Sequence, residues 1–460
     1  MSKSILTEIA LCSFLWFTSA SAIAEPSAYD IETYFKPYVA TNNFSGSVLI
    51  ERPSGVVFAK SYGFANLREK VPNRLNTRYH IASLSILFTS AAVLRLIDEG
   101  KLDPKTRVSE LVPGVPNGEK ITIQELLDQN SGLPDANDLP GYENLLLAHQ
   151  TPESLIDFIR GKTPYAEPGL KSDREEHSGQ NLLALIVEKK TGQKFANAMK
   201  ELVFDPLGMR DSGIDDDTKI GGSVAQGYRP SGVAGLKAAQ SIHWSAKTGN
   251  GSAYSTVGDE WKWLQGILQG NFLSAKSRAA FINTTNGYGW TKVDRQRLGE
   301  RVFVSNGRAP GFSSHFEYFP KDGTLIVVLA NIEHDANPEI VHELAAFLRG
   351  KAYEQFSYQR VPLESVGHPQ GKFSFGSDFY RPNATLQLVS GADGVALNWP
   401  GGPSAPLLPI AKDQFMDRYY WTRVTLVHDS RNRLIELDYG KFRGAIRPRS
   451  SGALLFRMPS

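Results

Sequence analysis

The feature that most constrains this chain is β-patterned sequence at both ends of a long helical region. Residues 46–61 read as two strands around a turn, and residues 310–332 read as a second strand pair. Apolar residues at helical spacing, with start and stop signals, predict helices over 83–99, 123–129, 180–190 and 338–348. This order predicts one α/β unit whose sheet joins N- and C-terminal segments of the chain.

The pattern changes again after about residue 360. Residues 384–399 and 421–439 each read as a hairpin, and no convincing helix occurs in this part of the chain. We therefore predict a separate, small all-β domain at residues 360–460, which is an ordinary size for a domain. The α/β unit before it spans residues 25–355.

The first residues predict export. Lys3 precedes a short apolar run at 9–17, and small residues follow up to Ala24. This layout is typical of a secretory signal peptide at residues 1–24, and it favours a periplasmic or secreted protein. The apolar run is too short to span a bilayer, so we do not expect an integral membrane protein.

Composition excludes several kinds of site. The one cysteine, Cys12, lies in the predicted signal peptide, so disulfides, thiol catalysis and cysteine–zinc sites are excluded from the mature chain. With 50 Lys+Arg against 48 Asp+Glu, a nucleic-acid partner is not expected. His342-Glu343 begins like a zinc-binding helix but lacks the second histidine four residues on, so neither a metal site nor a cofactor is predicted.

Several short phrases occur in a fixed order between about residues 30 and 350. They are Phe44-Ser45-Gly46-Ser47-Val48-Leu49, Tyr62-Gly63-Phe64-Ala65-Asn66, Ile81-Ala82-Ser83-Leu84-Ser85, Ser131-Gly132-Leu133-Pro134-Asp135, Pro206-Leu207-Gly208-Met209 and Pro310-Gly311-Phe312-Ser313-Ser314. Together they closely resemble the class C-like serine β-lactamase and D-Ala-D-Ala carboxypeptidase/esterase superfamily, the penicillin-recognising serine hydrolases. The resemblance implies a β-lactamase-like antiparallel sheet flanked by helices, an inserted helical subdomain, a small C-terminal barrel and a site cleft near Ser83.

The family's nucleophile motif is S-x-x-K at the start of a helix, where the Lys amine takes the proton of the Ser hydroxyl. The matching residues here are Ser83-Leu84-Ser85-Ile86. Ser83 fills the nucleophile position, but Ile86 replaces the Lys and can neither accept a proton nor carry charge. The alternative readings are that Ser83 caps the helix and that Ile86 packs in the core.

The second motif, Tyr-x-Asn or Ser-x-Asn, aligns with Glu175-Glu176-His177, with a register that could shift by one residue. Glu175 replaces the Tyr and His177 replaces the Asn. Ser83, His177 and Glu175 would then form a rewired nucleophile, base and orienting group, because such triads are defined by geometry rather than by sequence position. The alternative is an exposed charged loop.

The third motif, K-T-G or H-x-G, aligns with Ser305-Asn306-Gly307, so Ser305 replaces the cationic or imidazole side chain. We interpret Lys247-Thr248-Gly249 as a chance match, because it lies roughly 60 residues too early. The resemblance implies an oxyanion hole formed by the backbone N–H groups of Ser83 and Arg308, and a substrate-binding role for Gly307 and Arg308. Arg308 would also supply the lost positive charge and bind a substrate carboxylate, unless it is an ordinary surface arginine.

Loss of the general base at all three motifs predicts an exported, catalytically degenerate family member. It would bind an acyl-peptide, peptidoglycan-like or ester ligand in the inherited cleft, or pair with an active homologue or a cell-wall partner. Two alternatives stay open. One is a serine hydrolase (esterase, amidase or peptidase) that uses Ser83 with His177 and Glu175. The other is a non-catalytic structural or partner-binding protein whose all-β domain does the binding.

Overall fold

The computed structural model describes residues 26–170, 176–218, 224–268, 270–359, 361–402 and 404–446. The predicted signal peptide and Cys12 lie outside the described residues. Among the described residues, no helix combines the length and the apolar character that crossing a membrane requires.

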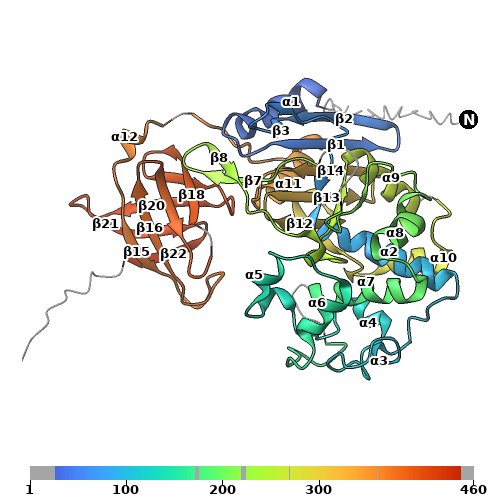
Figure 1. The fold of residues 1–460 in the computed structure, drawn as a ribbon. Helices are drawn as coiled ribbons and strands as arrows, with labels where there is room; N and C mark the ends of the chain where they lie inside the picture. The colour runs from blue at the N-terminus through green and yellow to red at the C-terminus, as the bar shows by residue number, and fades with distance from the viewer. Residues whose placement is uncertain are drawn as a thin grey trace, which may run out of the picture.

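The centre of the fold is a seven-stranded antiparallel sheet that joins distant parts of the chain (Figure 1). β1 (Gly46–Arg52) pairs on one side with β2 (Gly55–Tyr62) and on the other with β14 (Thr324–Ala330). This confirms that N- and C-terminal segments share one sheet. The sheet continues from β14 through β13 (Phe312–Phe319), β12 (Glu300–Ala309), β11 (Trp290–Arg295) and β10 (Asn286–Gly287).

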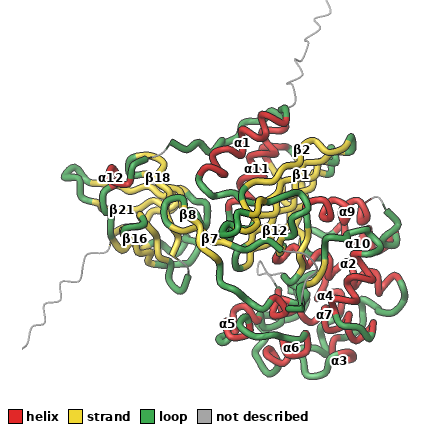
Figure 2. The backbone as a smooth tube through the Cα atoms, turned by 45° about the horizontal axis from the view of Figure 1, so that its top comes forward, coloured by secondary structure: helices red, strands yellow, loops and turns green. Residues whose placement is uncertain are grey.

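Helices cover both faces of this sheet, because alternate residues of its central strands point in opposite directions. Val48 and Val328 pack with α1 (Ala28–Ala40) and α11 (Ala336–Leu348) on one face. On the other face, Leu49 and Val327 share a core with two further helices, α2 (Ser85–Asp98) and α9 (Val257–Leu268). Figure 2 shows the helices on the two sides of the strands.

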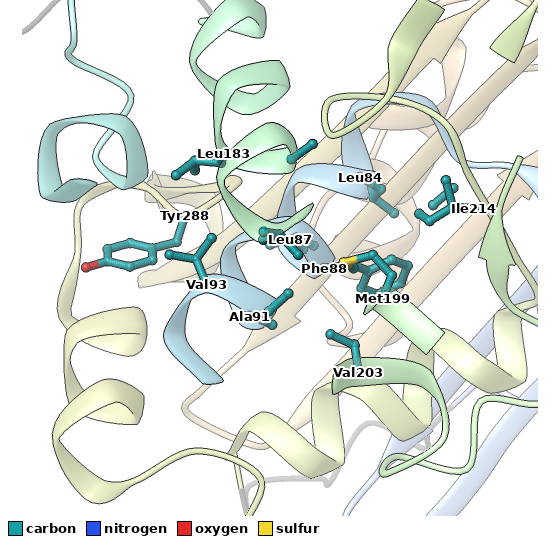
Figure 3. Close-up of a cluster of buried hydrophobic side chains, with 14 of the residues drawn as sticks. Leu84, Leu87, Phe88, Ala91, Val93, Leu183, Met199, Val203, Ile214 and Tyr288 are labelled. Atoms are coloured by element: carbon teal, nitrogen blue, oxygen red, sulfur yellow. The ribbon is translucent and has the colours of Figure 1, made fainter. Parts of the chain in front are cut away.

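A largely helical region lies beside the α2 face of the sheet (Figure 1). Its helices are α3 (Val108–Leu111), α4 (Ile123–Leu127), α5 (Tyr142–Leu145), α6 (Pro152–Ile159), α7 (His177–Thr191), α8 (Phe195–Met199) and α10 (Ala275–Asn283). Figure 3 shows how residues of α2, such as Leu87 and Phe88, pack with Leu183 of α7 and Met199 of α8. The helix predicted at 83–99 begins at Ser85 and ends before Gly100, whose φ of 69° suits a glycine after a helix. α7 begins three residues earlier than predicted.

Two short strand pairs and a small three-stranded sheet accompany the main sheet. They are β3 (Phe64–Asn66) with β4 (Val71–Pro72), β9 (Ala253–Ser255) between β5 (Tyr79–His80) and β6 (Gly213–Ile214), and β7 (Tyr228–Ser231) with β8 (Gly235–Ala238).

The C-terminal part is a closed barrel of eight antiparallel strands with its own apolar core. The strands are β15 (Gly371–Ser374), β16 (Thr385–Gly391), β17 (Gly394–Asn398), β18 (Ser404–Ala411), β19 (Gln414–Asp417), β20 (Arg423–His428), β21 (Leu434–Tyr439) and β22 (Phe442–Ile446). The expectation that no helix occurs after residue 360 is wrong in one detail. Four residues form α12 (Leu363–Val366) before the first barrel strand, where Pro362 provides the extended N-cap.

The β7–β8 hairpin lies between the main sheet and the barrel (Figure 1). Arg418, in the turn after β19, is fully buried there. Its guanidinium donates to backbone oxygens of both the hairpin and the segment that follows α1. One buried side chain therefore ties the barrel to two separate segments of the sheet domain, by which we mean the described residues from 26 to 351.

Candidate active site

Ser83 lies in a tight turn between the sheet and the helical region. The turn is the 3₁₀ helix η1 (Ala82–Leu84), and Ala82 adopts a φ of 50°, which is unusual for a residue with a Cβ. The neighbouring elements fix this conformation: the backbone N–H of Ile81 donates to Ala253 (3.0 Å), and the Ser85 hydroxyl donates to Ala82 (2.6 Å). Backbone strain held in this way is characteristic of functional turns.

Ser83 is not a helix cap. The N-cap position of α2 is Leu84, and no side chain caps that helix end. No hydrogen bond among the described residues involves the Ser83 hydroxyl, and the residue is half-buried. The capping role considered for Ser83 is therefore wrong, because η1 shifts the start of the α-helix by two residues.

Gly307 of β12 lies directly against this turn. A methyl group at position 307 would lie 2.4 Å from the carbonyl oxygen of Ile81 and 2.7 Å from the backbone nitrogen of Ser83. The Ser314 hydroxyl on β13 donates to the same Ile81 oxygen at 2.6 Å. Only glycine allows the strand to approach the Ser83 nitrogen so closely. The predicted oxyanion donors, the N–H groups of Ser83 and Arg308, thus belong to two segments in direct contact.

Ile86 offers no proton acceptor to Ser83. It is 4% exposed, and its Cγ2 lies 3.0 Å from the place that a Cβ on Gly289 would take. The side chain thus packs against the segment between β10 and β11, as its interpretation as a core residue predicts. A lysine here would bury an amine, at a cost of several kcal/mol unless it found a partner.

His177 is held by a carboxylate that the sequence reasoning did not single out. Its Nδ1 lies 3.0 Å from Oδ2 of Asp135, and its side chain is 16% exposed. Burial opposes ionisation of Asp135, but the hydrogen bond and charge of His177 outweigh burial and lower its pKa. Glu175, the expected orienting group, lies outside the described residues. The signal for Asp135 was its place at the end of the Ser131–Asp135 phrase.

Glu176 ties the start of α7 to the turn at Ser131 and Gly132. Its carboxylate, in a side chain only 2% exposed, accepts hydrogen bonds from the Ser131 N–H (3.0 Å), the Ser131 hydroxyl (2.8 Å) and the Gly132 N–H (2.9 Å). Glu176 is therefore a buried structural residue and not part of an exposed charged loop.

The third-motif position carries no cation. The Ser305 hydroxyl is buried and donates to the carbonyl oxygen of Gly289 at 2.6 Å. Arg308 binds Asp335 at 2.6 Å and lies over the rings of Tyr419 and Tyr420 in the barrel, at 5.0 and 5.7 Å. Burial opposes the charge of Arg308, but Asp335, with smaller contributions from Tyr419, Tyr420 and Glu333, more than compensates and raises its pKa. The charge of Arg308 is thus already paired within the protein.

The Lys247–Gly251 loop lies beside the Ser83 turn. It begins at the last residue of the 3₁₀ helix η4 (Trp244–Lys247). A Cβ placed on Gly251 would lie 3.3 Å from Cδ of Lys247 and 3.7 Å from the carbonyl carbon of Ala82, which is bonded to the Ser83 nitrogen. Lys247-Thr248-Gly249 is not on the third-motif strand, but this tripeptide, interpreted above as a chance match, lies on a loop next to the Ser83 turn.

A cavity of about 340 Å³ opens next to these elements, and His80, Trp244 and Phe312 are among its lining residues. The His80 ring stacks on Trp244 with centroids 3.7 Å apart, and its Nε2 lies 2.8 Å from Asp215. Burial lowers the pKa of His80 despite this carboxylate. Since β5 leads from His80 into η1, the cavity and Ser83 are built from the same segments. Among the described residues, no group of three or more His, Cys, Asp or Glu side chains is placed to hold a metal ion.

The sequence matches a known protein family, and the fold matches solved structures. Residues 31–351 match the family model described as Beta-lactamase. Penicillin-binding protein 4* of Bacillus subtilis (strain 168) is 25% identical over 350 residues, which cover 70% of this chain and 76% of the relative. The penicillin binding protein from Bacillus halodurans superposes with a TM-score of 0.60 at 25% identity, covering 69% of this chain and 98% of its own.

A further likeness in fold extends into the barrel. The octameric penicillin-binding protein homologue from Pyrococcus abyssi superposes with a TM-score of 0.62 at 24% identity, over 91% of this chain and 99% of its own. The sheet domain and barrel therefore occur together in another protein.

Proposed function

Because this chain belongs to the beta-lactamase family of penicillin-binding-like serine hydrolases, we propose that it is an exported, catalytically degenerate member. It binds an acyl-peptide, peptidoglycan-like or ester ligand beside Ser83 and turns it over slowly or not at all. The single observation that carries this proposal is Ile86, which is buried and packed where the family's proton-accepting lysine would stand.

The remaining side chains support the same proposal. The hydroxyl of Ser83 has no hydrogen-bond partner among the described residues, and the Ser305 hydroxyl is engaged with Gly289. Losing the group that activates a nucleophile costs on the order of 10⁴–10⁶ in kcat. A binding site and oxyanion donors alone retain about 10³ over water. These magnitudes favour a receptor or a very slow hydrolase over a fast β-lactamase.

Intact-mass spectrometry tests the proposal directly. The mature protein is incubated with a fluorophosphonate and, separately, with a penicillin, next to Ser83→Ala and the matched surface control Ser365→Ala. We expect no stoichiometric adduct over minutes in any of the three proteins, whereas calorimetry detects reversible penicillin binding to the wild type. Rapid labelling of the wild type and the control, but not of Ser83→Ala, would overturn catalytic degeneracy.

A second candidate function has its own supporting observation, the His177–Asp135 pair. A histidine whose Nδ1 is held by a carboxylate is the usual base-and-orienter arrangement of serine hydrolases. A rewired esterase, amidase or peptidase would then use Ser83 as nucleophile, His177 as base and Asp135 as orienting group, in place of the predicted Glu175.

For this second candidate, we expect His177→Ala to lower kcat/KM for a p-nitrophenyl ester at least about 10³-fold, with Asp135→Asn close behind, because members of such a unit act together. Ester hydrolysis is followed spectrophotometrically, with His149→Ala at an exposed histidine as control. Unchanged activity in His177→Ala would rule out this site.

A further inference from the structure

We propose that Lys247 is the specificity-determining residue of the Ser83 site and binds a carboxylate of the ligand. This inference rests on the proposed ligand-binding function and narrows it, because it selects carboxylate-bearing acyl compounds over neutral esters. It assigns the anion-binding role to the Lys247–Gly251 loop, which lies outside all three family motifs. The first and third motifs have Ile86 and Ser305 where the family has a cationic or imidazole side chain.

The loop that carries Lys247 is held by hydrogen bonds from α2 and α7 and by one hydrogen bond of its own. The Thr89 hydroxyl of α2 donates to the Gly249 carbonyl at 2.7 Å, and Asn181 of α7 donates to the Thr248 carbonyl at 2.6 Å. Within the loop, the Gly251 N–H donates to the Lys247 carbonyl at 2.8 Å. The loop is therefore a rigid support rather than a solvated excursion.

The Lys247–Gly251 loop also contacts His177 and Ala82, which lie on the two segments proposed to form the Ser83 site. Asn250 donates to the carbonyl oxygen of His177 (3.4 Å), and Gly251 lies over Ala82, as described above. The aliphatic stem of Lys247 and the backbone of Ala82 both pack against Gly251, so the lysine lies next to the turn that carries Ser83. A ligand acyl group held at Ser83 would thus lie beside the loop that carries the Lys247 ammonium.

The charge of Lys247 is available to a ligand. Its Nζ donates to the phenol oxygen of Tyr142 at 3.1 Å, and no carboxylate among the described residues lies within 4.0 Å of it. Arg308, by contrast, is paired with Asp335. A half-buried ammonium held by a neutral phenol keeps its charge unneutralised, so an anion gains more from binding there than from binding a solvated lysine.

Calorimetry with two probes tests this assignment. One probe is an N-acylated D-alanyl-D-alanine with a free carboxylate, and the other is the same compound with a C-terminal amide. We expect wild type to bind the carboxylate about 10- to 100-fold more tightly than the amide. Lys247→Met should bind both within about twofold, whereas Lys247→Arg and the exposed control Lys276→Met should keep the preference. Tyr142→Phe should weaken the preference without removing it.

The outcomes separate the two proposals. Equal binding of both probes by the wild type, or an unchanged preference in a folded Lys247→Met, would overturn the role of Lys247 and leave the binding function standing. Absence of binding of either probe and of penicillin to the wild type would overturn the proposed function itself, and the role of Lys247 with it. Circular dichroism of each variant establishes that it is folded.

Discussion

Arg418→Met is expected to lower the free energy of unfolding by about 3 to 5 kcal/mol and to loosen the barrel from the sheet domain. Arg418 is fully buried at the junction of the two parts. Burial lowers the pKa of Arg418 to about 10, so the guanidinium remains charged at neutral pH. Its partners are oxygens of neutral groups, namely those of Thr41, Asn42, Asn43, Ser231, Gly232 and Gly235.

The size of this effect follows from what methionine would leave behind. Methionine fills much of the volume but donates no hydrogen bond, so several buried or part-buried carbonyl oxygens would lose a donor at once. Three of these oxygens belong to the segment after α1 and three to the β7–β8 hairpin. Loss of the arginine therefore weakens both attachments of the barrel together.

Urea unfolding followed by circular dichroism measures the stability loss, and limited trypsin digestion measures release of the barrel by cleavage between α11 and α12. The matched control is Arg423→Met, since Arg423 makes an exposed ion pair with Glu354 that is worth at most about 1 kcal/mol. Equal stabilities of Arg418→Met and Arg423→Met would contradict the anchoring role.

Glu260→Gln changes the free energy of unfolding by a different amount at each pH. We expect its effect at pH 9 to be more stabilising than its effect at pH 4 by on the order of 4 kcal/mol. Glu260 is a fully buried residue of α9. Burial raises the pKa of its carboxyl group from 4.5 to about 8, and the charge of Asp259 adds to this increase.

The sign follows from proton binding. Between pH 4.5 and about 8 the native state holds a proton on Glu260 that the unfolded state has released, so stability falls as pH rises through this window. Glutamine is neutral at every pH and removes this dependence. Urea unfolding at pH 4, 6 and 9 measures the difference, with the exposed control Glu119→Gln. A constant difference between Glu260→Gln and wild type across this range would show that Glu260 ionises normally.

The sequence predicts most of the fold because its strongest signals are local or carried by ordered phrases. The strand pairs of the sheet, the helix ending before Gly100 and the hairpins of the barrel all follow from periodicity and turn residues. The small errors lie at element ends. There, η1 replaced the first turn of α2, and the four-residue α12 is too short to leave a periodic signal.

For the candidate site, too, the sequence predicts some features and not others. Ser83, Ile86, His177, Ser305, Gly307 and Arg308 were located by motif alignment. Which side chains they contact does not follow from that alignment. Asp135 stands in a quoted phrase, but its pairing with His177, 42 residues away, is set by packing. The role of Lys247 depends on a loop that approaches Ala82 only in the folded chain.

By itself, the sequence determined the family resemblance, the sheet with its two contributing ends, the C-terminal barrel and the replacement of the lysine by Ile86. Side-chain identity and short-range periodicity indicate the strands, the helices and the all-β character of the C-terminal part, and the family resemblance implies its closure into a barrel. Only the tertiary structure decided that Arg308 is paired with Asp335, that Asp135 holds His177, and that Lys247 lies next to the turn of Ser83 without a carboxylate partner among the described residues. The physical reason is that the charge available at a site depends on which distant groups packing brings within hydrogen-bond distance.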